Sequence, residues 1–328
     1  MDERKIKISS WLAQQLNDAE FTLKPASSDA SFRRYFRVGL HDGNSLIVMD
    51  APPDKEQTGA FCRIARQFHQ TGLNVPEILA EDDIQGFVLM TDLGVRQYLD
   101  ELSAENAQSL YGNALDALLV LQSGTRGRED FLPAYSRELL AGEMDLFRDW
   151  YLTQHLGYRI TAKDHALMDR AWTTLTDSAL QQPQVWVHRD YHSRNLMLTD
   201  RFNPGILDFQ DAVTGPITYD LVSLLKDCYI EWPESRVEEW ALLYHDLALQ
   251  SDLLENGNQE LFLRWFHRMG IQRHLKVAGI FSRLYHRDGK DGYLADIPLT
   301  MRYLTRALEN DPELSELSDF IAELPCMP

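Results

Sequence analysis

The sequence contains little cysteine and no long apolar run. Three cysteines, Cys62, Cys228 and Cys326, occur among 328 residues, and they are odd in number and widely scattered. This pattern excludes a disulfide framework and the paired spacing of a zinc site, and it favours a reducing compartment, so we expect the cytoplasm. No apolar stretch reaches the roughly 20 residues that a membrane-spanning helix needs. We therefore expect no membrane segment.

Positive charge is also scarce. Lys and Arg number 32 against 50 Asp and Glu, which gives a net charge of −18. Nucleic-acid-binding domains are basic, so we expect no nucleic-acid partner. The amino terminus opens with charged residues and lacks the apolar core of a signal peptide. The remaining composition, 44% apolar and 25% charged, is typical of a globular protein. We infer no obligate protein partner.

Residues 21–93 have the alternating pattern and turn residues of an antiparallel sheet that carries one helix. The turn His41–Asn44 indicates a hairpin between two of the strands. The expected elements are strands at Phe32–Gly39 and Ser45–Asp50, a helix at Thr58–Gln70, and strands at Glu77–Ala80 and Phe87–Thr91. With one strand before them, the order is β-β-β-α-β-β.

From Val95 onward, apolar residues recur at the three- and four-residue spacing of helices. The expected helices are Tyr98–Leu121, Glu138–His155, Lys163–Ala179, Tyr219–Tyr229, Arg236–Gln250, Gln259–Arg287 and Pro298–Leu308. The fold class is therefore α+β, with a small antiparallel β lobe followed by a large, mainly helical lobe. We place the boundary at Thr91, which gives domains 1–91 and 92–328.

One short motif interrupts the helical part. Residues His188 to Asn195 have the form H-x-D-x-x-x-x-N, and Asp208 follows thirteen residues later. In a phosphoryl-transfer site one carboxylate accepts the proton of a hydroxyl, while an Asn and a second Asp bind Mg²⁺. Asp190 is the predicted base. Asn195 and Asp208 are the predicted Mg²⁺ ligands, because they offer hard oxygens and a hairpin between them returns the chain.

With these two lobes and this loop, the chain resembles the aminoglycoside phosphotransferase family of small-molecule kinases. Three segments carry the resemblance, namely the loop with His192 two residues after Asp190, Ile206–Phe209, and Gly215–Leu221. The resemblance implies a bilobal, protein-kinase-like fold, ATP as phosphoryl donor and Mg²⁺ as cofactor. It makes 1–91 the nucleotide-binding lobe and 92–328 the catalytic and substrate-binding lobe. It also places His192 near the transferred phosphoryl group, although a hydrogen bond that braces the loop explains this residue equally well.

The predicted nucleotide-binding residues come from the first hairpin and from the end of the sheet. They are Ser28, Ser31, Phe32, Arg33, Arg34, Met90 and Asp92. The lysine that kinases carry on the third strand is missing from Leu46–Asp50, and the following helix has no acid but two arginines. In kinases this strand lysine pairs with an acid on the following helix. We therefore expect the reverse arrangement here, in which the acid Asp50 on the strand pairs with Arg63 or Arg66 on the helix, and Arg33 or Arg34 contacts phosphate. The alternative is that Asp50 ends the strand and Lys55 supplies the charge.

A narrower resemblance concerns the acceptor. The segments Ser28–Arg37, Glu143–Trp150 and Leu275–Lys290 are similar to those of bacterial kinases that phosphorylate the C1 hydroxyl of N-acetylmuramate and N-acetylglucosamine. Those enzymes serve peptidoglycan recycling, and the resemblance implies a small-molecule amino sugar as substrate. The predicted substrate contacts are Glu143, Trp150, Arg194, Gln272 and Arg273.

The segment Arg264–Lys290 contains seven Lys or Arg residues and one acid, in a chain that is otherwise acidic. A basic face there favours an anionic acceptor, such as the lactyl carboxylate of N-acetylmuramate, over a polycationic one. A solvated basic surface explains the same residues. Two other functions also stay open: a kinase for another acceptor (an aminoglycoside, choline or a methylthio-sugar), and a nucleotide-binding, pseudokinase-like module.

Overall fold

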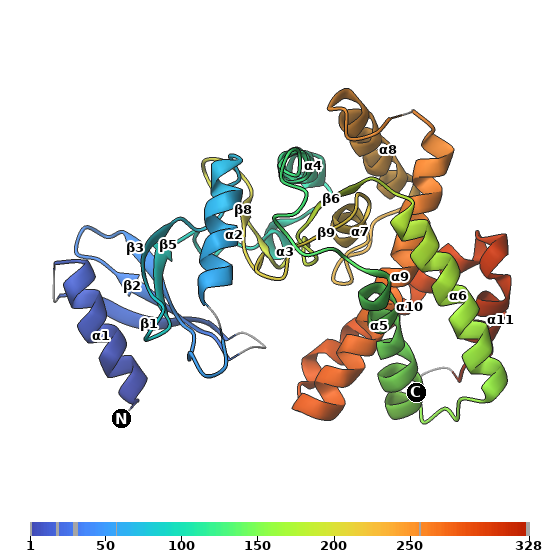
Figure 1. Ribbon diagram of the computed structural model, residues 1–328, viewed down its shortest axis with the longest axis horizontal. Coiled ribbons are helices and arrows are strands. Elements are labelled where there is room, and N and C mark those ends of the chain that lie inside the picture. Colours follow the sequence, from blue (N-terminus) through green and yellow to red (C-terminus); the bar gives the residue numbers. More distant parts are fainter. Residues whose placement is uncertain (1, 18–19, 29–31, 57, 256, 326–328) are drawn as a thin grey trace. The chain divides into compact units, whose positions relative to one another are not determined.

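The computed structural model describes most of the chain in two compact units (Figure 1). The described residues are 2–17, 20–28, 32–56, 58–255 and 257–325, with the side chains of 27 and 28 left out. The first unit comprises residues 1–114 and 194–210, and the second comprises 115–193 and 211–328. This division differs from the boundary that we placed at Thr91, because the first unit also takes in the segment 92–114 and the later segment 194–210.

The first unit is built on a five-stranded antiparallel sheet in the order β1-β2-β3-β5-β4. Its strands are β1 (Thr22–Ser28), β2 (Arg34–Gly39), β3 (Ser45–Asp50), β4 (Ile78–Asp82) and β5 (Phe87–Thr91). The three central strands pair without a shift in register, so that Arg34 lies opposite Asp50 and Asp50 lies opposite Phe87. The order and type of the elements agree with the sequence prediction.

Two helices cover opposite faces of this sheet, as Figure 1 shows. Helix α1 (Glu3–Gln15) buries Ile8 and Trp11 against Phe36 and Val48. Helix α2 (Thr58–Gln70) lies on the other face and buries an apolar stripe that includes Phe61. Side chains alternate between the two faces of a strand, so a residue next to a core position on the α1 side faces α2.

The first unit ends in short elements. They are α3 (Tyr98–Glu101), β7 (Leu196–Met197), β8 (Gly205–Ile206) and the start of α4 (Ala107–Ser123), which continues into the second unit. Strands β7 and β8 pair as the hairpin expected after Asn195. The prediction of one helix over Tyr98–Leu121 was wrong, because the chain leaves the helix after Glu101 and the Asn106 side chain accepts a hydrogen bond from the Ser103 amide at 2.8 Å.

The second unit is mainly helical. Its helices are α5 (Arg137–Leu146), the π-helix η1 (Phe147–His155), α6 (Ala162–Leu180), α7 (Tyr219–Leu225), α8 (Glu234–Gln250), α9 (Gln259–Asp288), the 3₁₀ helix η2 (Asp291–Asp296), α10 (Ile297–Glu309), the 3₁₀ helix η3 (Pro312–Leu314) and α11 (Ser315–Ala322). Strands β6 (Gln184–Val187) and β9 (Val213–Pro216) of this unit pair in antiparallel fashion. Sequence periodicity located the main helices but did not distinguish η1 from the α-helix that precedes it.

Helix α9 is the central element of this unit. It packs against α5, η1, α6, α7 and α10, and most of its residues from Arg268 to Ser282 are buried. Gly279 allows the close approach to α5, because a Cβ atom there would lie 2.3 Å from the carbonyl carbon of Leu146. The helix ends at Gly289, which adopts the left-handed conformation with φ 68°.

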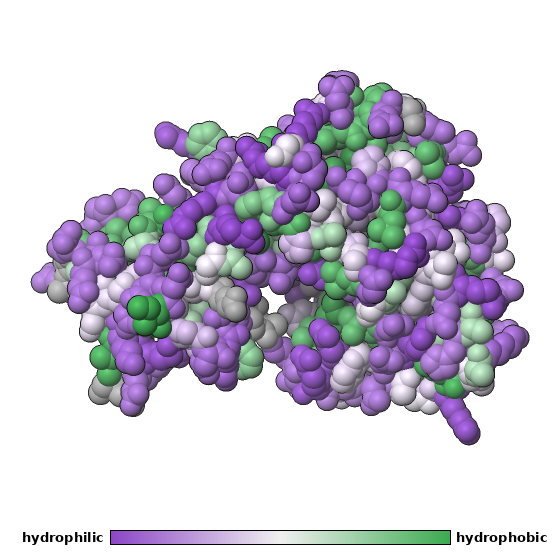
Figure 2. Space-filling view, viewed as in Figure 1, coloured by the Kyte–Doolittle hydropathy of each residue, from purple (hydrophilic) through white to green (hydrophobic). Residues whose placement is uncertain are grey.

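The surface in Figure 2 is mostly hydrophilic, with hydrophobic residues in small separate groups. Scattered groups of this kind are ordinary on a folded domain. No helix in the described part of the chain is long and apolar enough to cross a membrane.

The core of the second unit contains a buried histidine that makes stability depend on pH. His274 on α9 stacks on Tyr303, and its Nε2 lies 3.0 Å from the carbonyl oxygen of Lys226. Burial lowers the pKa of His274 to about 3. The unfolded chain, in which the pKa of this histidine has its ordinary value of about 6.5, therefore binds the proton first as the pH falls.

We expect the free energy of unfolding to decrease as the pH falls below about 6.5. Between the unfolded and folded pKa values of His274, the loss approaches about 1.4 kcal/mol for each pH unit. Urea unfolding at pH 7.5, 6 and 5 measures this effect. In His274→Gln, whose amide still donates to the Lys226 carbonyl, the loss between pH 7.5 and 5 should be smaller. An equal loss in both proteins would show that other groups cause it.

Candidate active site

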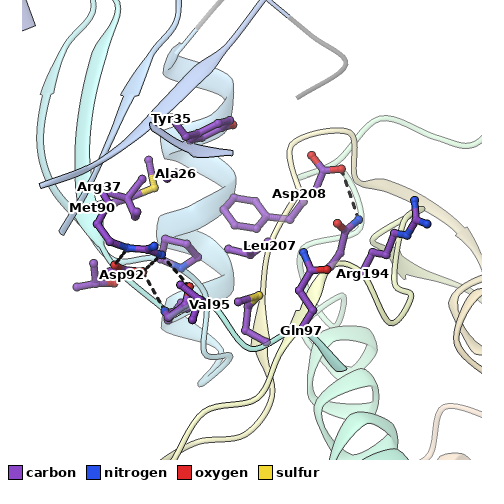
Figure 3. Close-up of a pocket in the computed structure, with 18 of the residues that line it drawn as sticks. Ala26, Tyr35, Arg37, Met90, Asp92, Val95, Gln97, Arg194, Leu207 and Asp208 are labelled. Carbon is purple, nitrogen blue, oxygen red and sulfur yellow. Dashed lines mark hydrogen bonds and ion pairs between the residues drawn. The ribbon is translucent and has the colours of Figure 1, made fainter. Parts of the chain in front are cut away.

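The first unit contains a cavity of about 350 Å³ (Figure 3). Its lining comes from β2, β3, β5, α2, the segment that follows β5, and the β7–β8 region. The sheet supplies Tyr35, Arg37, Ile47 and Met90, all on the face opposite α1. The mixture of apolar walls with few polar groups is typical of a small-molecule site. Met90 and Asp92, two of the predicted nucleotide-binding residues, are part of this lining.

The polar edge of the cavity is held by an ion pair that sequence reasoning missed. Arg37 Nε lies 2.5 Å from an oxygen of Asp92, and Arg37 also donates to the carbonyl oxygen of Gly94 at 2.9 Å. Ser45 donates to the same carboxylate at 2.7 Å. Burial opposes ionisation of Asp92, but the bonds from Arg37 and Ser45 lower its pKa. The segment after β5 is thereby fixed to the sheet.

The residues predicted for the phosphate loop are described only in part. Ser31 lies outside the described residues, and of Ser28 only the backbone, at the end of β1, is described. Phe32 is exposed, with Lys55 over its ring at 4.3 Å, and Arg33 donates to Glu56. None of these described side chains lines the cavity. Their contact with nucleotide stays a prediction.

The expected pairing of Asp50 with α2 was wrong. The Asp50 carboxylate is fully buried on the α1 side of the sheet, where it pairs with Arg4 and Arg34. Arg34 is its partner because the two residues lie directly opposite in the β2–β3 register. Arg66 instead pairs with Glu81 at 3.0 Å. The guanidinium of Arg34, one of the two arginines predicted to contact the nucleotide phosphates, is thus bound on the face of the sheet away from the cavity.

The two predicted metal ligands lie together at the cavity. Asn195 precedes β7 and Asp208 follows β8, and the hairpin brings the Asn195 amide nitrogen to 3.5 Å from Asp208 Oδ2 (Figure 3). Asp208 has a φ of 63°, a conformation that a residue other than glycine adopts mainly where its surroundings impose it. Gln210 donates to the other carboxylate oxygen at 2.7 Å. Arg194, predicted to contact substrate, also lines this cavity.

Asp190 lies in the second unit, in the loop that follows β6. Asp220 at the start of α7 is fully buried and accepts hydrogen bonds from the amides of His188 at 2.6 Å and Arg189 at 3.0 Å. These bonds hold the turn just before Asp190, in which Arg189 has a φ of 77°. Burial opposes ionisation of Asp190, but the charges of Lys276 and nearby cations lower its pKa. The carboxylate is therefore ionised at neutral pH, as a proton acceptor must be.

His192 lies in the same loop as Asp190. Its amide donates to the carbonyl oxygen of Asp190 at 3.0 Å, which closes a tight turn around the predicted base. Its ring packs edge-on against Tyr229, with 5.6 Å between ring centroids. Both contacts agree with the bracing alternative for His192, and its place near the phosphoryl group stays a prediction.

Three of the predicted substrate contacts meet in a buried cluster of the second unit, which we call the Glu143 cluster. It consists of Glu143, Gln272 and Arg273 together with Tyr135, Arg189, Tyr219 and Lys276. Glu143 pairs with Arg189 and with Lys276, the latter at 3.0 Å. Burial opposes its ionisation, but the charges of Lys276 and Arg189 lower its pKa. The Glu143 carboxylate is therefore ionised, and its oxygens accept hydrogen bonds from neighbouring side chains of the protein.

The other half of the cluster surrounds the Tyr219 hydroxyl. Lys276 donates to this oxygen at 2.8 Å, and Arg273 approaches it at 3.5 Å and donates to the carbonyl oxygen of Arg189 at 3.2 Å. Sequence reasoning missed Lys276 and Tyr219 as site residues. Lys276 belonged to the basic segment and follows Arg273 by three residues, which is the spacing that would have identified it.

Trp150 does not belong to the Glu143 cluster. It lies in η1 and is partly exposed, and no ring contact to it occurs among the described residues. Its predicted role as a stacking platform is neither supported nor contradicted by a contact. The basic segment Arg264–Lys290 does not form one continuous basic face. Arg268 is bound to Asp311 at 2.6 Å, whereas Arg287 near the end of α9 is exposed.

Comparisons with known proteins place these features in context. A model of the phosphotransferase enzyme family (APH) matches residues 22–254. An N-acetylmuramate/N-acetylglucosamine kinase of Pseudomonas aeruginosa is 48% identical over 92% of this chain and 88% of its own. A kinase of the same name from Neisseria meningitidis serogroup B is 43% identical over 98% and 96%, and one from Pseudomonas putida is 44% identical over 98% and 97%.

Solved structures confirm the predicted fold class. The ADP-bound aminoglycoside phosphotransferase APH(2'')-Ib superimposes with a TM-score of 0.59 at 15% identity, over 93% of this chain and 97% of its own. Choline kinase LicA from Streptococcus pneumoniae gives a TM-score of 0.60 at 11% identity, over 95% and 99%. At such low identity these similarities establish the kinase-like fold alone.

Proposed function

Given that the chain belongs to the phosphotransferase enzyme family, we propose that it transfers a phosphoryl group from ATP to the C1 hydroxyl of N-acetylmuramate and N-acetylglucosamine. The observation that carries this proposal is the 43–48% identity to three relatives named N-acetylmuramate/N-acetylglucosamine kinase, over 92–98% of this chain. Solved relatives described with bound ADP or ATP support ATP as the donor. The product would be a sugar 1-phosphate, with ADP as the leaving group.

The charge of the Glu143 cluster supports an anionic acceptor. Its three buried or partly buried cations, Arg189, Arg273 and Lys276, outnumber its one carboxylate, Glu143, and they still do so when Asp190, whose charge interacts with Lys276 and Arg273, is counted as well. A third carboxylate, Asp220, has its pKa raised by burial to about 7. A polycationic aminoglycoside would meet like charge in a poorly solvated site, which costs binding. The carboxylate of N-acetylmuramate would instead meet charges of the opposite sign.

In the proposed reaction Asp190 orients the sugar hydroxyl and accepts its proton while the hydroxyl oxygen attacks the terminal phosphorus of ATP. The bond from that phosphorus to ADP breaks as the new O–P bond forms. An anomeric hydroxyl is more acidic than an ordinary alcohol, which suits a carboxylate of lowered pKa. The two amides held by Asp220 keep the turn before Asp190 in place.

Asn195 and Asp208 are the residues that would hold Mg²⁺. Their amide and carboxylate oxygens are the hard donors that this ion prefers, and the hairpin places the two side chains 3.5 Å apart. Bound Mg²⁺ would neutralise charge on the phosphates of the nucleotide. The cavity at β2, β3 and β5, with Met90 and Asp92 in its lining, would receive the rest of the nucleotide.

A comparison of acceptors tests the proposal. We expect ADP release from ATP with N-acetylmuramate and N-acetylglucosamine, and at least 100-fold lower kcat/KM with kanamycin or choline, because each cation would lie near Arg273 and Lys276. Phosphorus NMR of the product should show a C1 phosphate. Turnover with kanamycin or choline but with neither sugar would overturn the proposed acceptor.

A further inference from the structure

A buried carboxylate beyond the end of α7 binds the last residue of the loop that contains Asp190. Asp227 Oδ2 accepts hydrogen bonds from the amide of Ser193 at 2.9 Å and from its hydroxyl at 2.5 Å. The second oxygen accepts from the amide of Tyr229 at 3.2 Å. Asp227 and Ser193 are 2% and 1% exposed, so solvent does not compete for these bonds.

No cationic side chain among the described residues forms an ion pair with Asp227, so the contacts of its side chain are hydrogen bonds. A polar side chain buried this deeply is costly unless its hydrogen bonds are satisfied, and the three bonds to Asp227 satisfy it. Two of its three donors belong to one residue, Ser193. The carboxyl group of Asp227 therefore contacts the loop at one residue, Ser193.

Helix α7 and the residues directly after it supply two buried carboxylates that bind this loop. Asp220, in its first turn, accepts from the amides of His188 and Arg189 at the start of the loop. Asp227 accepts from Ser193 at the other end, and Asp190 lies between the two attachments. We propose that Asp227 is a positioning residue, which fixes the second end of the loop 188–193 and thereby the direction of the Asp190 carboxylate. This inference rests on the proposed role of Asp190.

The residue before Asp227 is itself anchored. The Lys226 ammonium lies 2.8 Å from Glu234 of α8, and the Lys226 carbonyl oxygen lies 3.0 Å from Nε2 of His274 on α9. Lys226 has a φ of −116° and a ψ of 45°, which ends the helix and turns the chain toward the loop. The carboxylate is therefore held by the helical core, and it can transmit that rigidity to Ser193.

The chemistry of an Asn substitution makes the idea testable. An amide has one oxygen and one NH₂ group, so in Asp227→Asn the NH₂ must face either the Ser193 donors or the Tyr229 amide. At least one of these donors then loses its acceptor. A loop that moves by about 1 Å places the base poorly, and displacements of this size can cost about 100-fold in rate.

We expect Asp227→Asn to lower kcat with N-acetylmuramate at least tenfold while the KM for ATP stays within about twofold, because none of the residues 188–193 lines the nucleotide cavity. Ser193→Ala should give a smaller loss and Ser193→Thr, which keeps the hydroxyl, a recovery. In the double variant Asp227→Asn/Ser193→Ala, the loss of kcat should equal the loss in Asp227→Asn alone, since the two substitutions break the same contact. Asp311→Asn, which removes a buried acid bound to Arg268, should leave kcat unchanged.

A second measurement does not depend on the acceptor. Hydrogen–deuterium exchange of the peptide covering 188–195 should accelerate in Asp227→Asn and Ser193→Ala, whereas exchange in α9 should not change. If Asp227→Asn fails to fold, Ser193→Ala provides the same comparison. Unchanged exchange, or an unchanged kcat in Asp227→Asn, would overturn the positioning role. A wild-type protein that phosphorylates neither sugar would overturn the proposed function instead, and the exchange would still test the contact.

Discussion

The Asp190→Asn variant should lose about 100- to 10,000-fold in kcat with N-acetylmuramate, which is the range that a positioned general base contributes. The substitution keeps the size of the side chain and removes its ability to accept a proton. It should leave the loop intact, because the backbone contacts of Asp190 do not involve the carboxylate. Its amide donates to His188 Nδ1 at 3.2 Å, and its carbonyl oxygen accepts from the His192 amide at 3.0 Å.

The measurement is steady-state release of ADP, with ATP affinity and the midpoint of urea unfolding followed in parallel. Asp211→Asn is the matched control, because Asp211 is an exposed acid close in sequence whose side chain has no hydrogen bond or ion pair among the described residues. We expect that variant to match the wild type. If Asp190→Asn retained more than a third of the wild-type kcat, Asp190 would not be the base.

The candidate site divides into a part that the sequence could predict and a part that it could not. The motif of Asp190, Asn195 and Asp208 is local, since a loop and one short hairpin contain all three residues. Their spacing alone therefore predicted that Asn195 and Asp208 would lie together, as they do at 3.5 Å. The sheet was equally accessible, because the strand Ser45–Asp50 and the helix Thr58–Gln70 are bounded by turn residues at both ends.

The wrong pairing of Asp50 shows where such reasoning fails. Alternation along β3 separates its residues into two faces, but the apolar character of Ile47, Val48 and Met49 does not tell which face belongs to which helix. The true partners, Arg4 and Arg34, lie 46 and 16 residues away, and one of them comes from the first helix. Long-range contacts of this kind follow from strand register and packing, which composition does not encode.

The Glu143 cluster was predicted in part for the same reason. Gln272 and Arg273 were identified by charge and by resemblance, but the bonds that bind Glu143 come from residues 135, 189, 272 and 276. Helix α9 and the loop after β6 must fold before these groups meet. The sequence thus predicted which residues belong to the cluster better than it predicted their roles. Glu143, predicted to contact substrate, is bonded to neighbouring side chains.

The second large effect concerns stability. Glu143→Ala should lower the free energy of unfolding by about 3–5 kcal/mol, because it leaves two cations in a buried site without their carboxylate. The Glu143 and Lys276 side chains are both 7% exposed, and that of Arg189 is 20% exposed, so water can replace the lost acceptor only in part. The Tyr135 hydroxyl and the Gln272 amide lose their acceptor as well.

Urea unfolding at pH 7.5 measures the loss, and Glu316→Ala is the matched control. Glu316 pairs with Arg170, but both side chains are more than 60% exposed, so its removal should change the free energy of unfolding little. In a double-mutant cycle, Lys276→Met should be less damaging in the Glu143→Ala background than in the wild type, because its charge has already lost its partner. A Glu143→Ala variant as stable as the control would show that the cluster stays solvated, and an additive cycle would show that Arg189 alone balances the carboxylate.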